Sequence, residues 1–204
     1  MELQEKMAMQ DRLQKQLDFI LEVDKMKNII RQTYLSDGSR KENDAEHSYH
    51  LAVMCFFLSE YANEPINVEH TMQMVLLHDV IEIDAGDTYA YDAEANKTKT
   101  LREQKAAEHL YGMLPVEQGE RYKNLWQEFE DGITPEARFA NALDRVQPVL
   151  LTNRAGGQSW LEHGVKKSQI MTRVDKVKLG SEQLYKYVVS LINKNVKKGL
   201  LVDE

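Results

Sequence analysis

The sequence has 204 residues, 42% of them hydrophobic, which is enough for one sizeable core, so we expect a single domain over residues 1–204. Its 26 Lys and Arg residues and 33 Asp and Glu residues give a net charge of −7, which disfavours nucleic acid and anionic membranes as partners. The single cysteine excludes an internal disulfide, and no apolar run reaches the roughly 20 residues that a transmembrane helix needs. The first thirty residues also lack the pattern of a secretion signal, so a cytoplasmic location is expected.

Apolar residues recur at spacings of three and four along most of the chain, and Gly and Pro are scarce, at 10 and 4 residues. This pattern predicts an all-α fold, a compact bundle of about seven helices. In chain order, the helical stripes are Leu13–Leu21, Leu51–Leu58, Met72–Asp79, Leu101–Leu114, Tyr122–Phe129, Ala140–Leu151 and Leu184–Ile192. Clusters of Gly, Pro, Asn, Asp and Ser predict breaks at 36–41, 63–67, 85–96, 132–135 and 153–158.

The second helix has a recognisable start. Asn43 begins a capping-box pattern, with Glu46 three residues later. His47 and His50 then lie on adjacent turns of one helical face, so either imidazole could be a metal ligand. The spacing does not choose between them, and a histidine near a helix start is more often a surface or capping residue.

The third helical stripe contains a carboxylate, because Asp79 follows Met72 by seven residues and Val75 by four. A buried ionised Asp needs a cationic side chain, backbone donors or a metal ion as its partner, since desolvating an unpaired carboxylate costs several kcal/mol. His78 beside it supports a metal. Taken alone, however, the dipeptide favours the plainer alternative of a locally paired Asp79 and an ordinary half-buried His78.

Two further carboxylates follow this dipeptide. Glu82 falls one turn later on the same face, where it could act as a general acid or base near a metal, or be a solvated residue at a helix end. Gly86 suits a left-handed cap that ends the helix and places Asp87 on a loop beside the same site. Asp87 could equally be a turn former.

Asp144 is a second carboxylate on a packing face, which it shares with Leu143 and Leu151. Pro148 cannot donate the backbone hydrogen bond that the Asp144 carbonyl would accept, which predicts a kink or altered turn that helps to aim the side chain. Two imidazoles and two carboxylates would suit Mn²⁺, Fe²⁺, Co²⁺ or Zn²⁺ and leave positions open for water. The set is His47, His78, Asp79 and Asp144.

Four segments together resemble the HD-domain metal-dependent phosphohydrolases, and within them the small stand-alone 5′-deoxynucleotidase-like group, over the span Phe19–Leu151. These segments are Ala45–Ser48, His78–Glu82, Asp84–Asp87 and Leu143–Arg145. The resemblance implies one divalent metal ion, whether Mn, Co, Fe, Zn, Ni or Mg, and chooses His47 over His50 as a ligand alongside His78, Asp79 and Asp144. It also implies that Glu82 and Asp87 lie near the attacking water or the leaving group, and that Arg31 contacts substrate phosphate. Helices over residues 160–198 would pack on this core.

The chain departs from the family pattern after Arg31. Gln32 stands where the best-matching nucleotidases have a tryptophan associated with the substrate sugar, which puts discrimination against ribonucleotides in doubt. Only His109 lies between the central motif and Asp144, whereas the dinuclear HD enzymes carry additional histidines there, so a single metal is favoured. The resemblance also suggests a homodimer, for which the N-terminal and C-terminal helices offer candidate surfaces.

The residues and the resemblance together predict hydrolysis of nucleoside monophosphates or deoxymonophosphates to nucleoside and phosphate by a metal-activated water. One alternative is an HD-type hydrolase of a diphosphate alarmone or a cyclic nucleotide, because the metal ligands are common to the superfamily. Another is a non-catalytic nucleotide-binding signalling protein, although binding alone would need neither Glu82 nor Asp87. Tyr89 and Tyr91, in the longest loop, could pack on a substrate base or cover the edge of the core.

Overall fold

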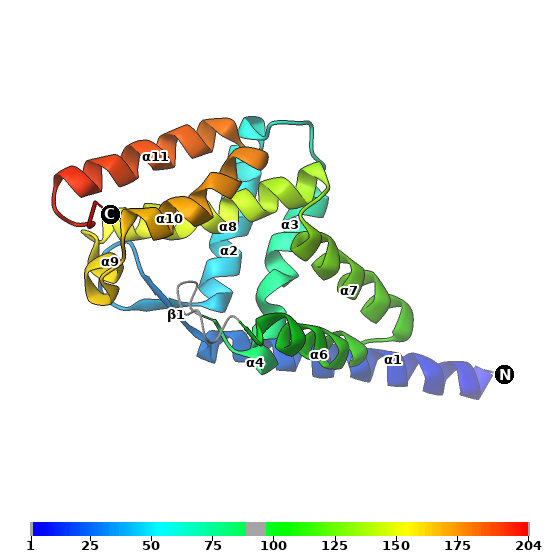
Figure 1. Ribbon diagram of the computed structural model, residues 1–204. Coiled ribbons are helices and arrows are strands. Elements are labelled where there is room, and N and C mark those ends of the chain that lie inside the picture. Colours follow the sequence, from blue (N-terminus) through cyan, green and yellow to red (C-terminus); the bar gives the residue numbers. More distant parts are fainter. Residues whose placement is uncertain (1, 89–96, 204) are drawn as a thin grey trace.

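The computed structural model describes residues 2–88 and 97–203, which form a helical bundle with one small sheet (Figure 1). The first part of the chain contains α1 (Glu2–Val23), β1 (Ile30–Tyr34), β2 (Lys41–Asn43), α2 (Asp44–Leu58), α3 (Val68–Leu77) and α4 (Glu82–Ala85). The second part contains α6 (Lys99–Gly112), α7 (Val116–Asp131), α8 (Pro135–Arg154), α9 (Gln158–His163), α10 (Lys167–Val174) and α11 (Glu182–Lys197). Connecting 3₁₀ turns are η1 (Asp24–Asn28), η2 (Ser59–Tyr61), η3 (His78–Ile81) and η4 (Asp175–Leu179). The predicted all-α fold class is confirmed.

The small sheet is a feature that the helical periodicity did not predict. Strands β1 and β2 pair antiparallel, with Ile30 opposite Asn43 and Tyr34 opposite Lys41. A tight turn joins them, in which Gly38 takes a φ of 72°, a conformation that glycine adopts without steric cost. Both strands are short and largely polar, so they lack the alternating apolar pattern by which strands are usually found. The hairpin leads directly into α2.

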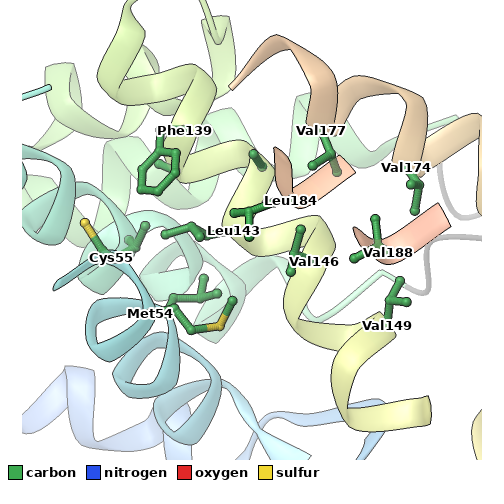
Figure 2. Packing of buried hydrophobic residues seen from close by; sticks show 14 of the residues in the cluster. Met54, Cys55, Phe139, Leu143, Val146, Val149, Val174, Val177, Leu184 and Val188 are labelled. Carbon is green, nitrogen blue, oxygen red and sulfur yellow. The ribbon is translucent and has the colours of Figure 1, made fainter. Parts of the chain in front are cut away.

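The larger core surrounds α8, which contacts α2, α3, α7 and α11 (Figure 2). Leu143 and Val146 on α8 are fully buried and pack with Cys55 of α2 and Val188 of α11. The C-terminal helices therefore share one core with the helices that precede them. Helix α8 stays α-helical from Pro135 to Arg154 despite Pro148, so the altered turn predicted beyond Asp144 is not observed.

A second, smaller core lies beneath η3 and α4. Val80 and Ile81 of η3 are buried there against Leu110 and Tyr111 of α6, and the Tyr111 hydroxyl donates a hydrogen bond of 2.8 Å to the carbonyl of Leu77. Burial of two consecutive apolar residues fixes the orientation of the turn that begins at His78. This small core therefore holds in place the turn that carries His78 and Asp79.

The apolar stripe predicted on the first helix lies largely at the surface. Its side chains are 45–70% exposed: Leu13, Leu17, Ile20 and Leu21. Only Phe19 of this stretch is buried, and the N-terminal end of the helix projects beyond α6 (Figure 1). Within the described residues, α1 is the longest helix, yet neither it nor any other is long and apolar enough to cross a bilayer.

Candidate metal centre

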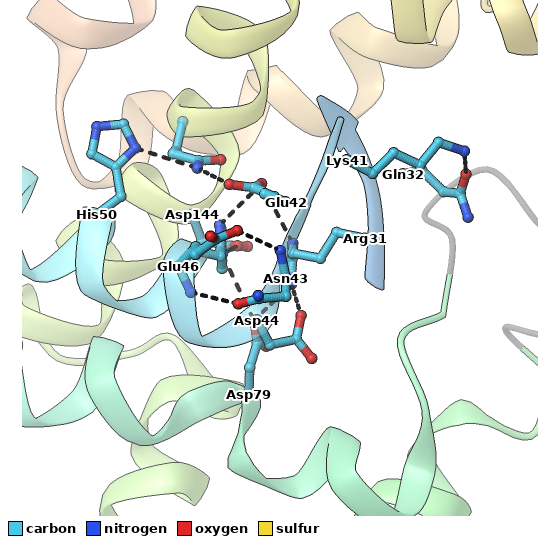
Figure 3. Close-up of polar contacts among 12 residues, drawn as sticks. Arg31, Gln32, Lys41, Glu42, Asn43, Asp44, Glu46, His50, Asp79 and Asp144 are labelled. Carbon is cyan, nitrogen blue, oxygen red and sulfur yellow. Dashed lines mark hydrogen bonds and ion pairs between the residues drawn. The ribbon is translucent and has the colours of Figure 1, made fainter. Parts of the chain in front are cut away.

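Helix α2 presents His47 to the interior. The predicted capping box is formed: the Asn43 side chain accepts a hydrogen bond from the Glu46 backbone, and the Glu46 carboxylate accepts one from the Asn43 backbone. His47 follows in the first turn with no exposed surface. His50, one turn later, is half-buried and instead accepts a 3.4 Å hydrogen bond from the Gln147 side chain (Figure 3).

His78 and Asp79 lie on a 3₁₀ turn, not on the continuous helix that the sequence predicted. Helix α3 ends at Leu77, and η3 tightens the chain before α4 begins at Glu82. The His78 Nδ1 donates a 2.9 Å hydrogen bond to the Val75 carbonyl, so its other ring nitrogen is directed away from the backbone. A 3₁₀ turn often marks a functional interruption of a helix, and here it is held by the buried residues that follow.

The four predicted ligands come together in one buried cluster. The Nε2 atom of His47 lies 3.2 Å from Oδ1 of Asp144 and 3.7 Å from Oδ2 of Asp79. The Nε2 atom of His78 lies 3.1 Å from Oδ1 of Asp79 and 3.9 Å from Oδ1 of Asp144. His47, His78 and Asp144 each offer one ligand atom within 4.8 Å of the others, and His50 is not part of the group.

The electrostatics of the cluster call for a cation. Burial lowers the pKa of His78, but the carboxylates of Asp79 and Asp144 override it and raise that pKa to about 10. Burial would raise the pKa of Asp144, yet its hydrogen bond with His47 and the nearby ring of His78 hold it well below its ordinary value. Burial and the charge of Arg31 lower the pKa of His47 to about 4, so this imidazole stays neutral and able to bind a metal.

The donor set fits a divalent transition metal. Two imidazoles and two carboxylates suit Mn, Fe, Co or Zn, and four protein ligands leave positions open on a metal of higher coordination number. The Nε2 atom of His78 is buried and has no hydrogen-bond partner within the described part of the chain. Such an unsatisfied atom is costly in a protein interior, and coordination of a metal ion would satisfy it.

A layer of carboxylates behind this cluster was missed by the sequence reasoning (Figure 3). The Arg31 Nη1 donates hydrogen bonds of 3.0 Å to Asp44 and 2.8 Å to Asp79, while its Nε lies 3.7 Å from Glu42. The positive charge of Arg31 therefore already occupies the space between Asp44 and Asp79. Asp44 and Glu42 gave no signal, because one looked like part of a helix start and the other lies on an unpredicted strand.

Glu82 and Asp87 line the same pocket as Arg31, His78 and Asp79, as predicted for residues near a reacting group. Burial and the nearby charges of Asp79 and Asp44 raise the pKa of Glu82 well above its ordinary value, and its Oε2 has no hydrogen-bond partner among the described residues. Burial raises the pKa of Asp87, and Asp79 adds to this effect while Arg31 opposes it. Gly86 has a φ of 74° but an extended ψ of 147°, so glycine is needed there, although not for the left-handed helical cap that was expected.

The pocket extends from the ligand cluster to a second wall. Helices α8, α9 and α10 contribute this wall, with Arg145, Ser159, Trp160 and Arg173 among the lining residues. The sequence indicated Arg145 only as part of the segment Leu143–Arg145, and no sequence pattern singled out Arg173. Tyr89 and Tyr91, the proposed base-packing residues, lie outside the described residues.

Comparisons with known proteins show which family the chain resembles. A family model for the HD domain matches residues 23–185. The chain is 30% identical over 135 residues to the 5′-deoxynucleotidase HDDC2 of Xenopus laevis, and this stretch spans 66% of either chain. It is 27% identical over 148 residues to the protein of the same name from Homo sapiens, which covers 72% of this chain and 70% of that relative.

Solved structures extend the likeness to the whole fold. A structure described as a predicted metal-dependent phosphohydrolase from Magnetospirillum magnetotacticum MS-1 is 45% identical, with a TM-score of 0.90 over 94% of this chain and 96% of that one. A conserved hypothetical protein from Pyrococcus furiosus shares the fold at 22% identity, with a TM-score of 0.59 over 89% of this chain and 99% of that one. The resemblance drawn from the four sequence segments is thereby confirmed.

Proposed function

This chain belongs to the HD domain family, and we propose that it is a metal-dependent phosphohydrolase that converts nucleoside 5′-monophosphates or deoxymonophosphates to nucleoside and phosphate. The observation that carries the proposal is the cluster of His47, His78, Asp79 and Asp144, in which every member except His47 lines a pocket. The names of the relatives from Xenopus laevis and Homo sapiens support a nucleotide as the substrate class.

The residues of the cluster have separate tasks in this proposal. His47, His78, Asp79 and Asp144 would hold the ion. When bound, a divalent cation supplies Lewis acidity toward water and toward a phosphoryl oxygen. The neutral imidazole of His47 and the ionised carboxylate of Asp144 are already in the protonation states that ligands require.

Glu82 and Asp87 share the proton transfers. One of them takes a proton from the attacking water, and the other gives a proton to the leaving oxygen of the nucleoside. Both carboxyl groups have raised pKa values because both are buried in the pocket wall beside Asp79. A raised pKa lets a carboxyl group hold a proton near neutral pH, as an acid catalyst must.

Arg31 is assigned to the substrate phosphate. Its guanidinium lines the pocket, and carboxylates keep its pKa well above the ordinary value despite burial. A guanidinium is a planar fork of donors that matches phosphate oxygens. Because its Nη1 is engaged by Asp44 and Asp79, only the remaining donors of Arg31 are free to contact a ligand.

The proposal is tested by phosphate release from a panel of ribonucleoside and deoxyribonucleoside 5′-monophosphates. The metal is first removed and then restored as Mn²⁺, Co²⁺, Mg²⁺ or Zn²⁺, with Asp79→Ala as the inactive variant and the exposed Asp131→Ala as its matched control. We expect metal-dependent release that Asp79→Ala abolishes and Asp131→Ala retains. No phosphate release from any of these monophosphates, or hydrolysis only of a separately assayed diphosphate or cyclic nucleotide with its products identified, would contradict the assigned reaction.

The same assay separates the two carboxylates. Glu82→Gln and Asp87→Asn keep shape and remove the proton, so each should lower kcat by about 100-fold or more while metal binding is retained. Replacing the residue that serves as the base should also remove the acidic limb of the pH profile of kcat/KM. A variant with unchanged kcat would show that its carboxyl group takes no part in proton transfer.

Gln32 bears on sugar selection. Its side chain lines the pocket but is held by a 2.7 Å hydrogen bond from the Lys41 ammonium, and its backbone carbonyl accepts a 3.1 Å bond from Ser159. A glutamine held in this way gives no flat apolar surface against the sugar. We therefore propose that ribonucleotides and deoxyribonucleotides are hydrolysed at similar rates, which the panel measures directly.

A further inference from the structure

The cationic side chains of the pocket fall into two classes. Among the described lining residues, four are Lys or Arg: Arg31, Lys99, Arg145 and Arg173. Arg31 is paired with Asp44 and Asp79, and Lys99 lies 3.4 Å from Glu103. Neither Arg145 nor Arg173 forms an ion pair with a carboxylate of the described residues. The two unpaired guanidiniums come from the same wall of the pocket.

The position of Arg145 is fixed by α8. Its Nη1 donates two hydrogen bonds of 2.7 Å, one to the backbone carbonyl of Asn141 and one to the side-chain oxygen of the same residue. Asn141 is itself anchored by a 2.6 Å bond from its amide to the carbonyl of Phe129. Arg145 is therefore held by neutral acceptors, which orient its guanidinium without a direct ion pair to a carboxylate of the described residues.

Arg173 approaches from α10, which packs beside α8 (Figure 1). Its neighbours Ile170 and Val174 are each 1% exposed and anchor α10 in the larger core, while Arg173 itself is half-buried at the pocket. Arg145 and Arg173 line the same pocket. Burial lowers the pKa of Arg145, Asp144 and Glu130 oppose this shift, and the positive charge of Arg173 adds to it.

Two guanidiniums without a direct ion pair on one wall of a partly buried pocket are an unfavourable arrangement, which Asp144 offsets only for Arg145. The chain has 33 acidic residues, so the lack of a partner here is not a lack of supply. A bound anion would relieve the repulsion, and guanidinium pairs bind the oxygens of phosphate well because each offers a fork of donors. Packing alone gives no reason to keep both charges.

We propose that Arg145 and Arg173 form an anion-binding pair that holds the phosphate of substrate and product at the wall of the pocket built by α8 and α10. The inference rests on the proposed function only in that the anion is the phosphate that the reaction releases. It assigns a binding role to α10, which lies beyond the motif-bearing segment Phe19–Leu151. It also explains how an acidic chain attracts an anionic substrate into a pocket lined with carboxylates.

The test is calorimetric binding of inorganic phosphate to the Mn²⁺-loaded full chain. Arg145→Gln and Arg173→Gln should each weaken phosphate affinity at least tenfold, whereas Arg173→Lys, which keeps the charge but loses the fork, should weaken it by a smaller factor. The matched controls are Arg154→Gln, an exposed arginine at the end of α8, and Lys176→Gln, an exposed lysine of η4. Both controls remove one positive charge outside the pocket and should change the affinity less than twofold.

The outcomes separate the pair from the proposed reaction. If Arg145→Gln fails to fold, because its contact with Asn141 is lost, the two Arg173 variants still decide. Phosphate affinity in Arg173→Gln within twofold of the unsubstituted chain, or no phosphate binding by the unsubstituted chain, overturns the pair. If Arg173→Gln loses phosphate binding and the unsubstituted chain hydrolyses no nucleotide, the arginine pair is supported and the proposed reaction is contradicted.

Discussion

The two walls of the pocket are built by different means. The metal wall consists of His78, Asp79 and Asp144, with His47 in contact with the two aspartates, and the arginine wall consists of Arg145 and Arg173. Most residues of the metal wall are placed by a local device, such as a capping box or a 3₁₀ turn. The arginine wall depends on α10 packing against α8, which is a tertiary contact. Functional residues that local structure positions can be predicted from the sequence, whereas those that helix packing positions can be identified only once the fold is known.

The largest effect is expected from a pair of histidines on one helix. His47→Ala removes a buried ligand and should lower nucleotide hydrolysis by at least about 1000-fold, and the protein should no longer retain Mn²⁺. His50→Ala, three residues away, removes an imidazole that contacts Gln147 and should keep both properties. Metal content after gel filtration and phosphate release give the two measurements.

The two histidine variants test whether the local structure of α2 determines the metal ligand. If His50→Ala loses the metal and His47→Ala keeps it, then α2 presents its other imidazole and the local capping geometry does not determine the ligand. Thermal unfolding of both variants is the control, because a fully buried His47 also contributes packing.

The limits of sequence reasoning follow the same division. Asp79 and Asp144 could be predicted because a carboxylate on an apolar helical face is an anomaly that only a charged partner resolves. Glu42 could not, because a short polar strand has no periodicity that would show which of its side chains is buried. Arg173 could not, because an arginine on a surface-like helix is ordinary until the fold places it beside Arg145. The exposure of the α1 stripe could not be predicted for the same reason: amphipathicity shows which residues share a face, but not what packs against that face.

A glycine pair tests whether the arginine wall depends on packing. Gly180 lies between η4 and α11, and a Cβ atom there would collide with the backbone of Arg138 on α8. Gly180→Ala should therefore destabilise the chain by about 2–3 kcal/mol and shift the elements that carry Arg173. Gly112→Ala is the matched control, because no atom lies within 4 Å of its Cβ position, and it should be neutral or slightly stabilising.

The measurements are urea unfolding, phosphate affinity and Mn²⁺ affinity of the two glycine variants. The difference between the walls predicts that Gly180→Ala weakens phosphate binding more than Mn²⁺ binding, since η4 contacts α8 but holds no metal ligand. Equal losses of both affinities would show that the walls move as one body, and the distinction between them would then fail.

The smallest expected effect concerns the carboxylate behind the metal wall. Glu42 is 2% exposed, and burial raises its pKa to about 7, although the charge of Arg31 and a 2.8 Å hydrogen bond from Gln147 oppose the shift. The folded chain therefore binds more protons than the unfolded chain between its ordinary pKa of 4.5 and about 7. The contribution of Glu42 to the free energy of unfolding therefore falls as pH rises through this interval.

Glu42→Gln removes this titration and keeps the contact with Gln147 within reach of an amide. The free energy of unfolding of each metal-free chain is measured near pH 5 and near pH 8. The change from pH 5 to pH 8 should favour the folded state more in Glu42→Gln than in the unsubstituted chain, by about 1–3 kcal/mol. The exposed Glu60→Gln controls for loss of a carboxylate elsewhere. An identical pH dependence in all three chains would show that Glu42 is ionised without cost, because Arg31 compensates it fully. The carboxylate layer would then stabilise the metal wall instead of straining it.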